Sequence, residues 1–312
     1  MKIVFLNISR INYDGKIDLS KYSDVTFYDS TNYDEIISRV NGYDVVVVKE
    51  MKLDRDLIYR FNGVKLICEA RTGYNNIDID ACRDMNINVC NAPGYATGNV
   101  ALFTIMLMLN MSVSMKSQQD MLHNGDYSNF FNILKVNYSE LTGKVLGIIG
   151  TGAIGSEVAR FATALGMNVI RYSHTKKEDT EYIHFVTLNE LLTNSDYISL
   201  HSLLNNDNYH MLNETNMNLI KNTAYIINTA RGALIDEEYL IKCLREHKIA
   251  GARLDVSEHE PLTSEDELFR LDNVIVTPYM AWNSLEARCR LMDIVFSNIN
   301  NYSNGKEYNS VY

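Results

Sequence analysis

The fold is decided by the stretch Lys144-Val145-Leu146-Gly147-Ile148-Ile149-Gly150-Thr151-Gly152-Ala153-Ile154-Gly155. An apolar run typical of a buried strand leads into a Gly-x-Gly-x-x-Gly pattern, and a helical segment, Ser156 to Leu165, follows. The first glycine permits a tight turn, the second lets backbone amides approach a phosphate, and the third lets the helix pack closely on the strand. Strand, glycine loop and helix in this order predict a dinucleotide-binding site. Its expected contacts are Gly150, Gly152, Ala153, Ile154 and Gly155.

The next predicted strand, Asn168–Tyr172, ends without the acidic residue that would hold a ribose 2′-hydroxyl. Ser173 occupies that position, and His174, Thr175, Lys176 and Lys177 follow it. A carboxylate would repel a 2′-phosphate, whereas these side chains are able to bind one. We therefore expect binding of NADP(H) to be favoured, with NAD(H) possible. The alternative is an exposed polar loop with solvated lysines.

Short apolar runs alternate with helix-like stretches on both sides of the glycine loop, the pattern of parallel sheets covered by helices. The run Val45–Val48 is β-branched throughout, as expected of a strand buried on both faces. A long helical stretch is expected from about Asn99 to His123, and the tail from Trp282 to Tyr302 is again helical. The predicted strands are Lys2–Leu6, Val25–Tyr28, Val45–Val48, Leu66–Cys68, Ile87–Cys90, Val145–Ile149, Asn168–Tyr172, Tyr197–Leu200, Ala224–Asn228, Ala252–Asp255 and Val274–Thr277.

Length and composition indicate a two-domain globular protein of 312 residues. The net charge of -10 argues against a nucleic-acid partner. Five cysteines without a Cys-x-x-Cys pair argue against a disulfide framework or zinc site, and no metal site is expected. The longest apolar stretch, Val100 to Leu109, is too short to cross a bilayer, and no signal peptide is evident. We expect a cytoplasmic protein without a membrane partner.

Four further segments accompany the glycine loop and the tripeptide Val276–Pro278: Thr72–Asp78, Asn91–Thr97, Ile227–Gly232 and Asp255–Leu262. The set resembles the D-isomer-specific 2-hydroxyacid dehydrogenases, in the branch of the glycerate, hydroxypyruvate and glyoxylate reductases. The resemblance covers nearly the whole chain. It implies two flavodoxin-like or Rossmann-like, doubly wound α/β domains around a cleft. Residues 1–98 with 286–312 would form the substrate domain, and residues 99–285 the dinucleotide-binding domain inserted into it. It also implies a homodimer through the latter domain and a small 2-oxo or 2-hydroxy acid as substrate.

The resemblance assigns roles to individual residues. Arg231 matches the arginine that holds the substrate carboxylate and the reacting carbonyl oxygen, a role suited to a guanidinium because it pairs bidentately and stays charged. Glu260 matches the glutamate that supports the general acid, and Asp255 matches a position that contacts the nicotinamide carboxamide. We expect further cofactor contacts from Thr104, Thr229 and Ala230, and substrate contacts from the loop residues Arg71, Thr72 and Gly73. Arg71 either adds a second positive charge or points into solvent.

The general acid departs from the family pattern, because Tyr279 follows Thr277-Pro278 where the family has histidine. Imidazole has a pKa near neutrality, whereas a phenol has a pKa of about 10, so it is a weaker acid and seldom acts as a base. Arg231 would lower the pKa of Tyr279 and Glu260 would raise it. Two histidines are alternative candidates for the general acid. His259 adjoins Glu260 and is expected at the surface, and His201 is expected to be structural.

Two functions remain open at this point. The first is a working oxidoreductase that favours reduction, with Arg231, Glu260 and Tyr279 as its catalytic residues. The second is a catalytically impaired nucleotide-binding protein that senses cofactor or binds a partner. Retention of Arg231 and Glu260 favours the first, since a pure binding module has no evident need for either.

Overall fold

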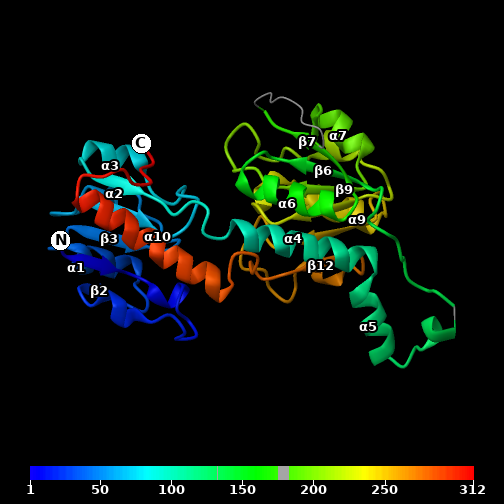
Figure 1. The fold of residues 1–312 in the computed structure, drawn as a ribbon, viewed down its shortest axis with the longest axis horizontal. Helices are drawn as coiled ribbons and strands as arrows, with labels where there is room; N and C mark the ends of the chain where they lie inside the picture. The colour runs from blue at the N-terminus through cyan, green and yellow to red at the C-terminus, as the bar shows by residue number, and fades with distance from the viewer. Residues whose placement is uncertain (132, 175–182) are drawn as a thin grey trace. The chain divides into compact units, whose positions relative to one another are not determined.

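The computed structural model describes residues 1–131, 133–174 and 183–312, and it divides into two compact units (Figure 1). Unit 1 comprises Met1–Ala96 and Asn283–Tyr312, and unit 2 comprises Thr97–Trp282. Each unit is a fully parallel sheet covered by helices, which confirms the expected α/β class. The chain leaves unit 1 once and returns to it for its last helix.

Unit 1 has a five-stranded sheet in the order β2-β1-β3-β4-β5, the flavodoxin-like arrangement. Its central strand is the β-branched run Val45–Val48, and each of these four valines is fully buried. The strands are β1 (Ile3–Phe5), β2 (Val25–Phe27), β3 (Val45–Val48), β4 (Leu66–Glu69) and β5 (Asn88–Cys90). The helices are α1 (Ile36–Val40), α2 (Arg55–Ile58), α3 (Ile79–Asp84) and α10 (Leu285–Ser303).

Unit 2 has a seven-stranded sheet in the order β12-β11-β10-β9-β6-β7-β8. Numbered from its own first strand, this is the Rossmann order 3-2-1-4-5-6 with a seventh strand at the edge. The strands are β6 (Val145–Ile149), β7 (Asn168–Tyr172), β8 (Ile183–Phe185), β9 (Tyr197–Leu200), β10 (Tyr225–Asn228), β11 (Gly251–Leu254) and β12 (Val274–Val276). The helices are α4 (Thr97–Ser112), α5 (Met115–His123), α6 (Ala153–Ala164), α7 (Leu188–Asn194), α8 (Glu214–Met217) and α9 (Glu237–Arg245).

The two faces of the unit 2 sheet carry separate apolar cores. On one face, α4 and α6 pack against the sheet through side chains such as Met108 and Val158. On the other face, α7, α8 and α9 do so through side chains such as Leu191 and Leu240. The strand order reverses between β6 and β9, which is where an open α/β sheet binds ligands beyond the carboxyl ends of its strands. The glycine loop follows β6 at this point.

Two features of the secondary structure were not predicted. The stretch expected to be helical from about Asn99 to His123 is helical, but it consists of two helices, α4 and α5, with a bend of 57°. Ser114 at the break has a left-handed backbone (φ 50°), and its hydroxyl donates to the carbonyl of Asn137, 23 residues further along the chain, at 2.6 Å. Strand β8 was not predicted, because three residues at a sheet edge give too short a pattern.

Within residues 1–131, 133–174 and 183–312, no helix taken singly is long and apolar enough to cross a bilayer, and only the bent pair of α4 and α5 meets that criterion jointly.

Candidate active site

The glycine loop has the shape that the sequence predicts. Gly150 has φ 111°, and a Cβ there would lie 2.6 Å from the His201 carbonyl carbon, so only glycine fits. A Cβ on Gly155 would lie 2.6 Å from the Gly150 carbonyl oxygen. Gly152 caps the amino end of α6 without a side-chain hydrogen bond, and a Cβ there would meet no atom within 4 Å. The loop thus offers uncapped helix amides beside open space, which fits a dinucleotide pyrophosphate.

The residues expected to choose between the two cofactors follow β7. The Thr151 hydroxyl donates to the Ser173 hydroxyl at 3.4 Å, so Ser173 lies beside the glycine loop. His174 is exposed. Thr175 and Lys176, together with Lys177, lie outside the described residues.

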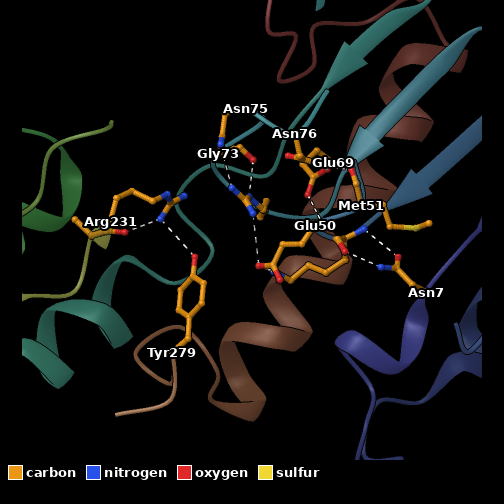
Figure 2. A network of polar contacts seen from close by, with 12 residues as sticks. Asn7, Glu50, Met51, Glu69, Gly73, Asn75, Asn76, Arg231 and Tyr279 are labelled. Atoms are coloured by element: carbon orange, nitrogen blue, oxygen red, sulfur yellow. Dashed lines mark hydrogen bonds and ion pairs between the residues drawn. The ribbon is translucent and has the colours of Figure 1, made fainter. Parts of the chain in front are cut away.

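Arg231 follows β10 at the carboxyl edge of the sheet. The buried Asn228 side chain shapes the turn, since its Oδ1 accepts from Ala230 N at 3.0 Å and its Nδ2 donates to the Arg231 carbonyl at 2.8 Å. The Arg231 guanidinium donates to the Ala230 carbonyl at 2.6 Å and to the Tyr279 hydroxyl at 3.4 Å (Figure 2). Arg231 and Tyr279, separated by 48 residues, are therefore neighbours.

Two buried hydroxyls lie behind this turn. Thr104 of α4 and Thr229 after β10 are within hydrogen-bonding distance of each other, at 3.1 Å between their Oγ1 atoms. The Thr104 hydroxyl also donates to the Val100 carbonyl within α4 at 2.9 Å. The contact between Thr104 and Thr229 ties α4 to the segment that carries Arg231.

Tyr279 has a left-handed backbone with φ 56°, a conformation that is costly for a bulky residue and is found where function demands it. Asp255, at the end of β11, supports this conformation. Its carboxylate accepts hydrogen bonds from the Thr277 hydroxyl (2.6 Å), Met280 N (2.8 Å) and Ala281 N (2.9 Å), while its carbonyl accepts from Tyr279 N (3.1 Å). Asp255 is only 1% exposed, and burial raises the pKa of its carboxyl group. These contacts make Asp255 the anchor of the Tyr279 loop.

The acidic segment after β11 contains two different glutamates. Glu260 is exposed, and its Oε1 accepts a hydrogen bond from Ser257 N at 3.1 Å. Glu258 is half-buried and accepts from Tyr209 (2.9 Å) and pairs with His210 Nε2 (2.7 Å). Burial raises the pKa of Glu258, but the hydrogen bonds from His210 and Tyr209 outweigh it and lower the pKa overall. Glu258 is therefore engaged by its neighbours and is not a solvated loop carboxylate, and the sequence analysis did not single out His210.

The two histidines that are alternative candidates for the general acid lie in different environments. His259 is exposed. The His201 ring approaches the Ser199 hydroxyl at 2.8 Å, and burial together with the positive charge of Arg171 lowers the pKa of His201 to about 3. His201 is therefore neutral at ordinary pH, as a structural histidine would be.

In unit 1, Arg71 is held by its own loop rather than pointing into solvent. Its guanidinium donates to the Gly73 carbonyl (2.8 Å) and the Asn75 side chain (3.0 Å), and it lies 3.7 Å from Glu50 (Figure 2). The Thr72 hydroxyl donates to the Ala92 carbonyl at 3.3 Å. Arg71 thus fixes the shape of the loop that contains Thr72 and Gly73.

A charged cluster that the sequence did not single out lies at the carboxyl ends of β3 and β4. Lys49 is 1% exposed and pairs with Glu50, while Glu69 is fully buried and accepts from Glu50 N (2.9 Å) and Asn76 (2.8 Å). Burial raises the pKa of Glu69 to about 7. Burial also lowers the pKa of Lys49. The sequence feature that could have identified this cluster is the Lys-Glu pair directly after an all-valine strand, because residues at that position lie at the ligand-binding edge of a parallel sheet.

Comparison with known proteins places this geometry in a family. The profile described as "D-isomer specific 2-hydroxyacid dehydrogenase, NAD binding domain" matches residues 105–281. A hydroxypyruvate reductase of Blautia hydrogenotrophica is 33% identical over 100% of this chain and 99% of its own length. A glyoxylate reductase of Thermococcus litoralis is 36% identical over 87% of this chain and 84% of its own.

A solved structure agrees over the whole chain. The acyclic imino acid reductase Bsp5, in complex with NADPH and D-Arg, has a TM-score of 0.88 and 30% identity over 100% of both chains. The chain belongs to the D-isomer-specific 2-hydroxyacid dehydrogenase family, and it is a nicotinamide-dependent oxidoreductase of small 2-oxo and 2-hydroxy acids.

Proposed function

We propose that this enzyme works chiefly as a reductase of 2-oxo acids, with Arg231 binding the substrate and Tyr279 donating the proton. The observation that carries the proposal is the contact between the Arg231 guanidinium and the Tyr279 hydroxyl, at 3.4 Å, on a Tyr279 backbone held in a strained conformation. A guanidinium only donates hydrogen bonds, so the phenol oxygen is the acceptor and the phenol keeps its own hydrogen as a donor.

The proposed reaction needs a hydride, which the reduced nicotinamide supplies when bound, and a proton. Arg231 neutralises the substrate carboxylate and polarises the carbonyl oxygen, which lowers the cost of placing negative charge there. The Tyr279 hydroxyl gives its proton to that oxygen. We assign Glu260 as the acidic partner that keeps the phenol protonated. Since a protonated phenol is a donor and not a base near neutrality, the enzyme favours reduction.

Steady-state rates of Tyr279 variants test this assignment. Tyr279→Phe is expected to lower kcat for glyoxylate or hydroxypyruvate reduction by ~10²–10⁴-fold with little change in cofactor affinity. Tyr279→His is expected to bring oxidation of the hydroxy acid to neutral pH. Arg231→Ala is expected to abolish turnover while NADPH still binds. If Tyr279→Phe reduces substrate as fast as the parent, the proton comes from another group and the assignment fails.

We also propose that the enzyme prefers NADP(H). Ser173 lies beside the glycine loop at the position where a carboxylate would repel a 2′-phosphate, and Lys176 and Lys177 follow it in the sequence. Calorimetric titration is expected to give tighter binding of NADPH than of NADH, and Ser173→Asp to reverse that order. Equal affinities in the parent would contradict the preference.

The remaining assignments follow the same reasoning. We propose that unit 2 is the dinucleotide-binding domain, with Thr104, Thr229 and Ala230 near the cofactor. Unit 1 is proposed as the substrate domain, in which the backbone amides of Thr72 and Gly73 bind the substrate carboxylate. A cytoplasmic location is proposed as well.

A homodimer is proposed because unit 2 exposes large apolar side chains that a second copy could cover. They belong to α4 and to the segment that follows α5. These side chains are Leu102 (58%), Met106 (41%), Leu109 (41%), Tyr127 (56%), Phe130 (73%), Phe131 (72%), Ile133 (58%) and Leu134 (60%). Light scattering on the purified protein is expected to give twice the chain mass of 35.6 kDa. A monomer at micromolar concentration would contradict this.

A second candidate activity is reduction of 2-imino acids, favoured by the phenol at position 279. A protonated imine already carries its proton on nitrogen, so hydride addition to C2 gives the amine without a general acid. The resulting amine then takes a further proton from water. A ketone, by contrast, needs a donor for its oxygen. The structural neighbour that binds NADPH and D-Arg is an imino acid reductase.

One comparison separates the two activities. NADPH oxidation is followed with pyruvate alone and with pyruvate plus methylamine at a pH where the imine forms. Imine reduction by Tyr279→Phe is expected to stay within a few-fold of the parent while reduction of the 2-oxo acid falls. Absence of any amine-dependent rate in the parent would exclude the imine activity without affecting the first proposal.

A further inference from the structure

Arg171 on β7 is a buried cation without a carboxylate partner among the residues the structure describes. It is 5% exposed. Its guanidinium donates to the Gly150 carbonyl at 3.4 Å and to the Ser156 hydroxyl at 3.2 Å, and it lies 5.9 Å from the centre of the Phe185 ring. Its Nε is buried without an acceptor. Buried charges in proteins are normally paired, so this arginine requires an explanation.

The place of Arg171 in the fold supplies that explanation. Gly150 is the first glycine of the loop, and Ser156 is in the first turns of α6, so both hydrogen bonds run to the strand–loop–helix unit. His201, which packs against the same loop, is kept neutral by burial and by the charge of Arg171. Arg171 is therefore the cation that lies beneath the loop.

A second buried arginine in the same sheet gives a contrast. Arg253 on β11 is 8% exposed and donates to the Ala252 carbonyl (2.8 Å) and the Asn273 carbonyl (3.1 Å). Asn273 immediately precedes β12, so Arg253 is held at the amino end of the sheet, opposite the ligand-binding edge. Both arginines are buried and donate to uncharged groups. Arg171 contacts the glycine loop at the carboxyl end of the sheet, whereas Arg253 is held at the amino end.

We propose that Arg171 is a positioning residue for the cofactor. Its positive charge is neutralised by the pyrophosphate of either dinucleotide, and this attraction strengthens binding of the dinucleotide to the glycine loop. The loop amides supply partial positive charge and the guanidinium beneath them adds a full one, in surroundings where screening by solvent is weak. The hydrogen bond to the Gly150 carbonyl also holds the loop in the form that directs its amides outward. The inference rests on dinucleotide binding and is independent of the preference between NADPH and NADH.

Three variants test the proposal: Arg171→Met, Arg171→Lys and the matched control Arg253→Met. Affinities for NADH and NADPH are measured by calorimetry, and the thermal midpoint of the ligand-free protein by calorimetric scanning. Arg171→Met is expected to weaken both cofactors by a similar factor, about 10- to 100-fold. Its ligand-free midpoint is expected to stay level or rise, since an unpaired buried charge has been removed. Arg171→Lys, which keeps the charge, is expected to bind both within a few-fold of the parent, and Arg253→Met to leave both affinities unchanged.

Each other outcome overturns the proposal in a recognisable way. Unchanged affinities in Arg171→Met would remove the cofactor role. Weakening confined to NADPH would place the charge at the 2′-phosphate instead. A fall in the ligand-free midpoint equal to that of Arg253→Met, with both variants losing affinity alike, would show a purely structural arginine. If Arg171→Met does not fold, Arg171→Gln replaces it, because glutamine keeps hydrogen-bond donors and has no charge. Arg171→Gln is expected to lose cofactor affinity as Arg171→Met would. A cofactor affinity equal to that of Arg171→Lys would refute the role of the charge.

Discussion

The stability of unit 1 is expected to fall as pH rises through neutrality, because of Glu69. Burial raises the pKa of this carboxyl from 4.5 to about 7 in the folded protein. Between these values the folded state holds a proton that the unfolded chain has released, so the free energy of unfolding decreases as pH increases. From about pH 5 to about pH 8 the loss amounts to about 2 to 3 kcal/mol. Glu69 is fully buried, so solvent screening does not reduce this value.

Native-state hydrogen exchange measures this loss where it occurs. Amides of β3 and β4 report the opening of unit 1. Tryptophan fluorescence would not serve, because the single tryptophan, Trp282, belongs to unit 2. The parent is compared with Glu69→Gln at both pH values, so that titration of all other groups cancels. The pH-dependent loss is expected in the parent and absent in Glu69→Gln. An identical pH dependence in both proteins, or a parent that gains stability with pH relative to the variant, would refute the reasoning.

Four further substitutions have defined outcomes. Gly155→Ala is expected to weaken NADPH binding at least ~10-fold and to destabilise unit 2 by about 1–3 kcal/mol, because its Cβ would press on the Gly150 carbonyl. The Cβ of Gly152→Ala would meet no atom within 4 Å, so this variant is expected to reduce cofactor affinity in titration and to leave the thermal midpoint unchanged. Asp255→Ala is expected to cost about 1–3 kcal/mol for each donor left without an acceptor and to lower kcat, and a fully active variant of parental midpoint would contradict its anchoring role. Arg231→Lys is expected to raise KM for the 2-oxo acid and lower kcat, since an ammonium lacks the bidentate fork; unchanged kinetics would rule out a bidentate contact.

The sequence predicts the fold well because its signals are local. The all-valine run Val45–Val48 and the apolar strand before Gly150 each carry enough information to fix a buried parallel strand. The break at Ser114 could not be predicted, because it depends on a hydrogen bond to Asn137, which lies 23 residues further along the chain. A helical pattern alone continues through such a position.

For the site, the sequence indicates which chemical groups are present, but it does not indicate the hydrogen-bond partners of those groups. Arg71 was open between adding charge and pointing into solvent, whereas its guanidinium is engaged by Gly73, Asn75 and Glu50. For Asp255 the sequence predicts a cofactor contact, and it does not reveal that both carboxylate oxygens accept hydrogen bonds from the Tyr279 loop. Such partners are set by tertiary packing, to which spacing along the chain gives no access.

The strained loop makes Tyr279→His a cleaner experiment than most substitutions at an active site. Residue 279 has φ 56°, and histidine is found in this left-handed region more readily than bulkier residues are. The contacts that hold the loop involve the backbone of residues 279–281 and the Thr277 hydroxyl, so none of them depends on the phenol. The variant is therefore expected to keep the parental thermal midpoint or exceed it, and any change in the pH profile is then attributable to the ring. A midpoint several degrees lower would mean that the loop is adapted to the phenol itself, and the contact with Arg231 would then be structural as well as catalytic.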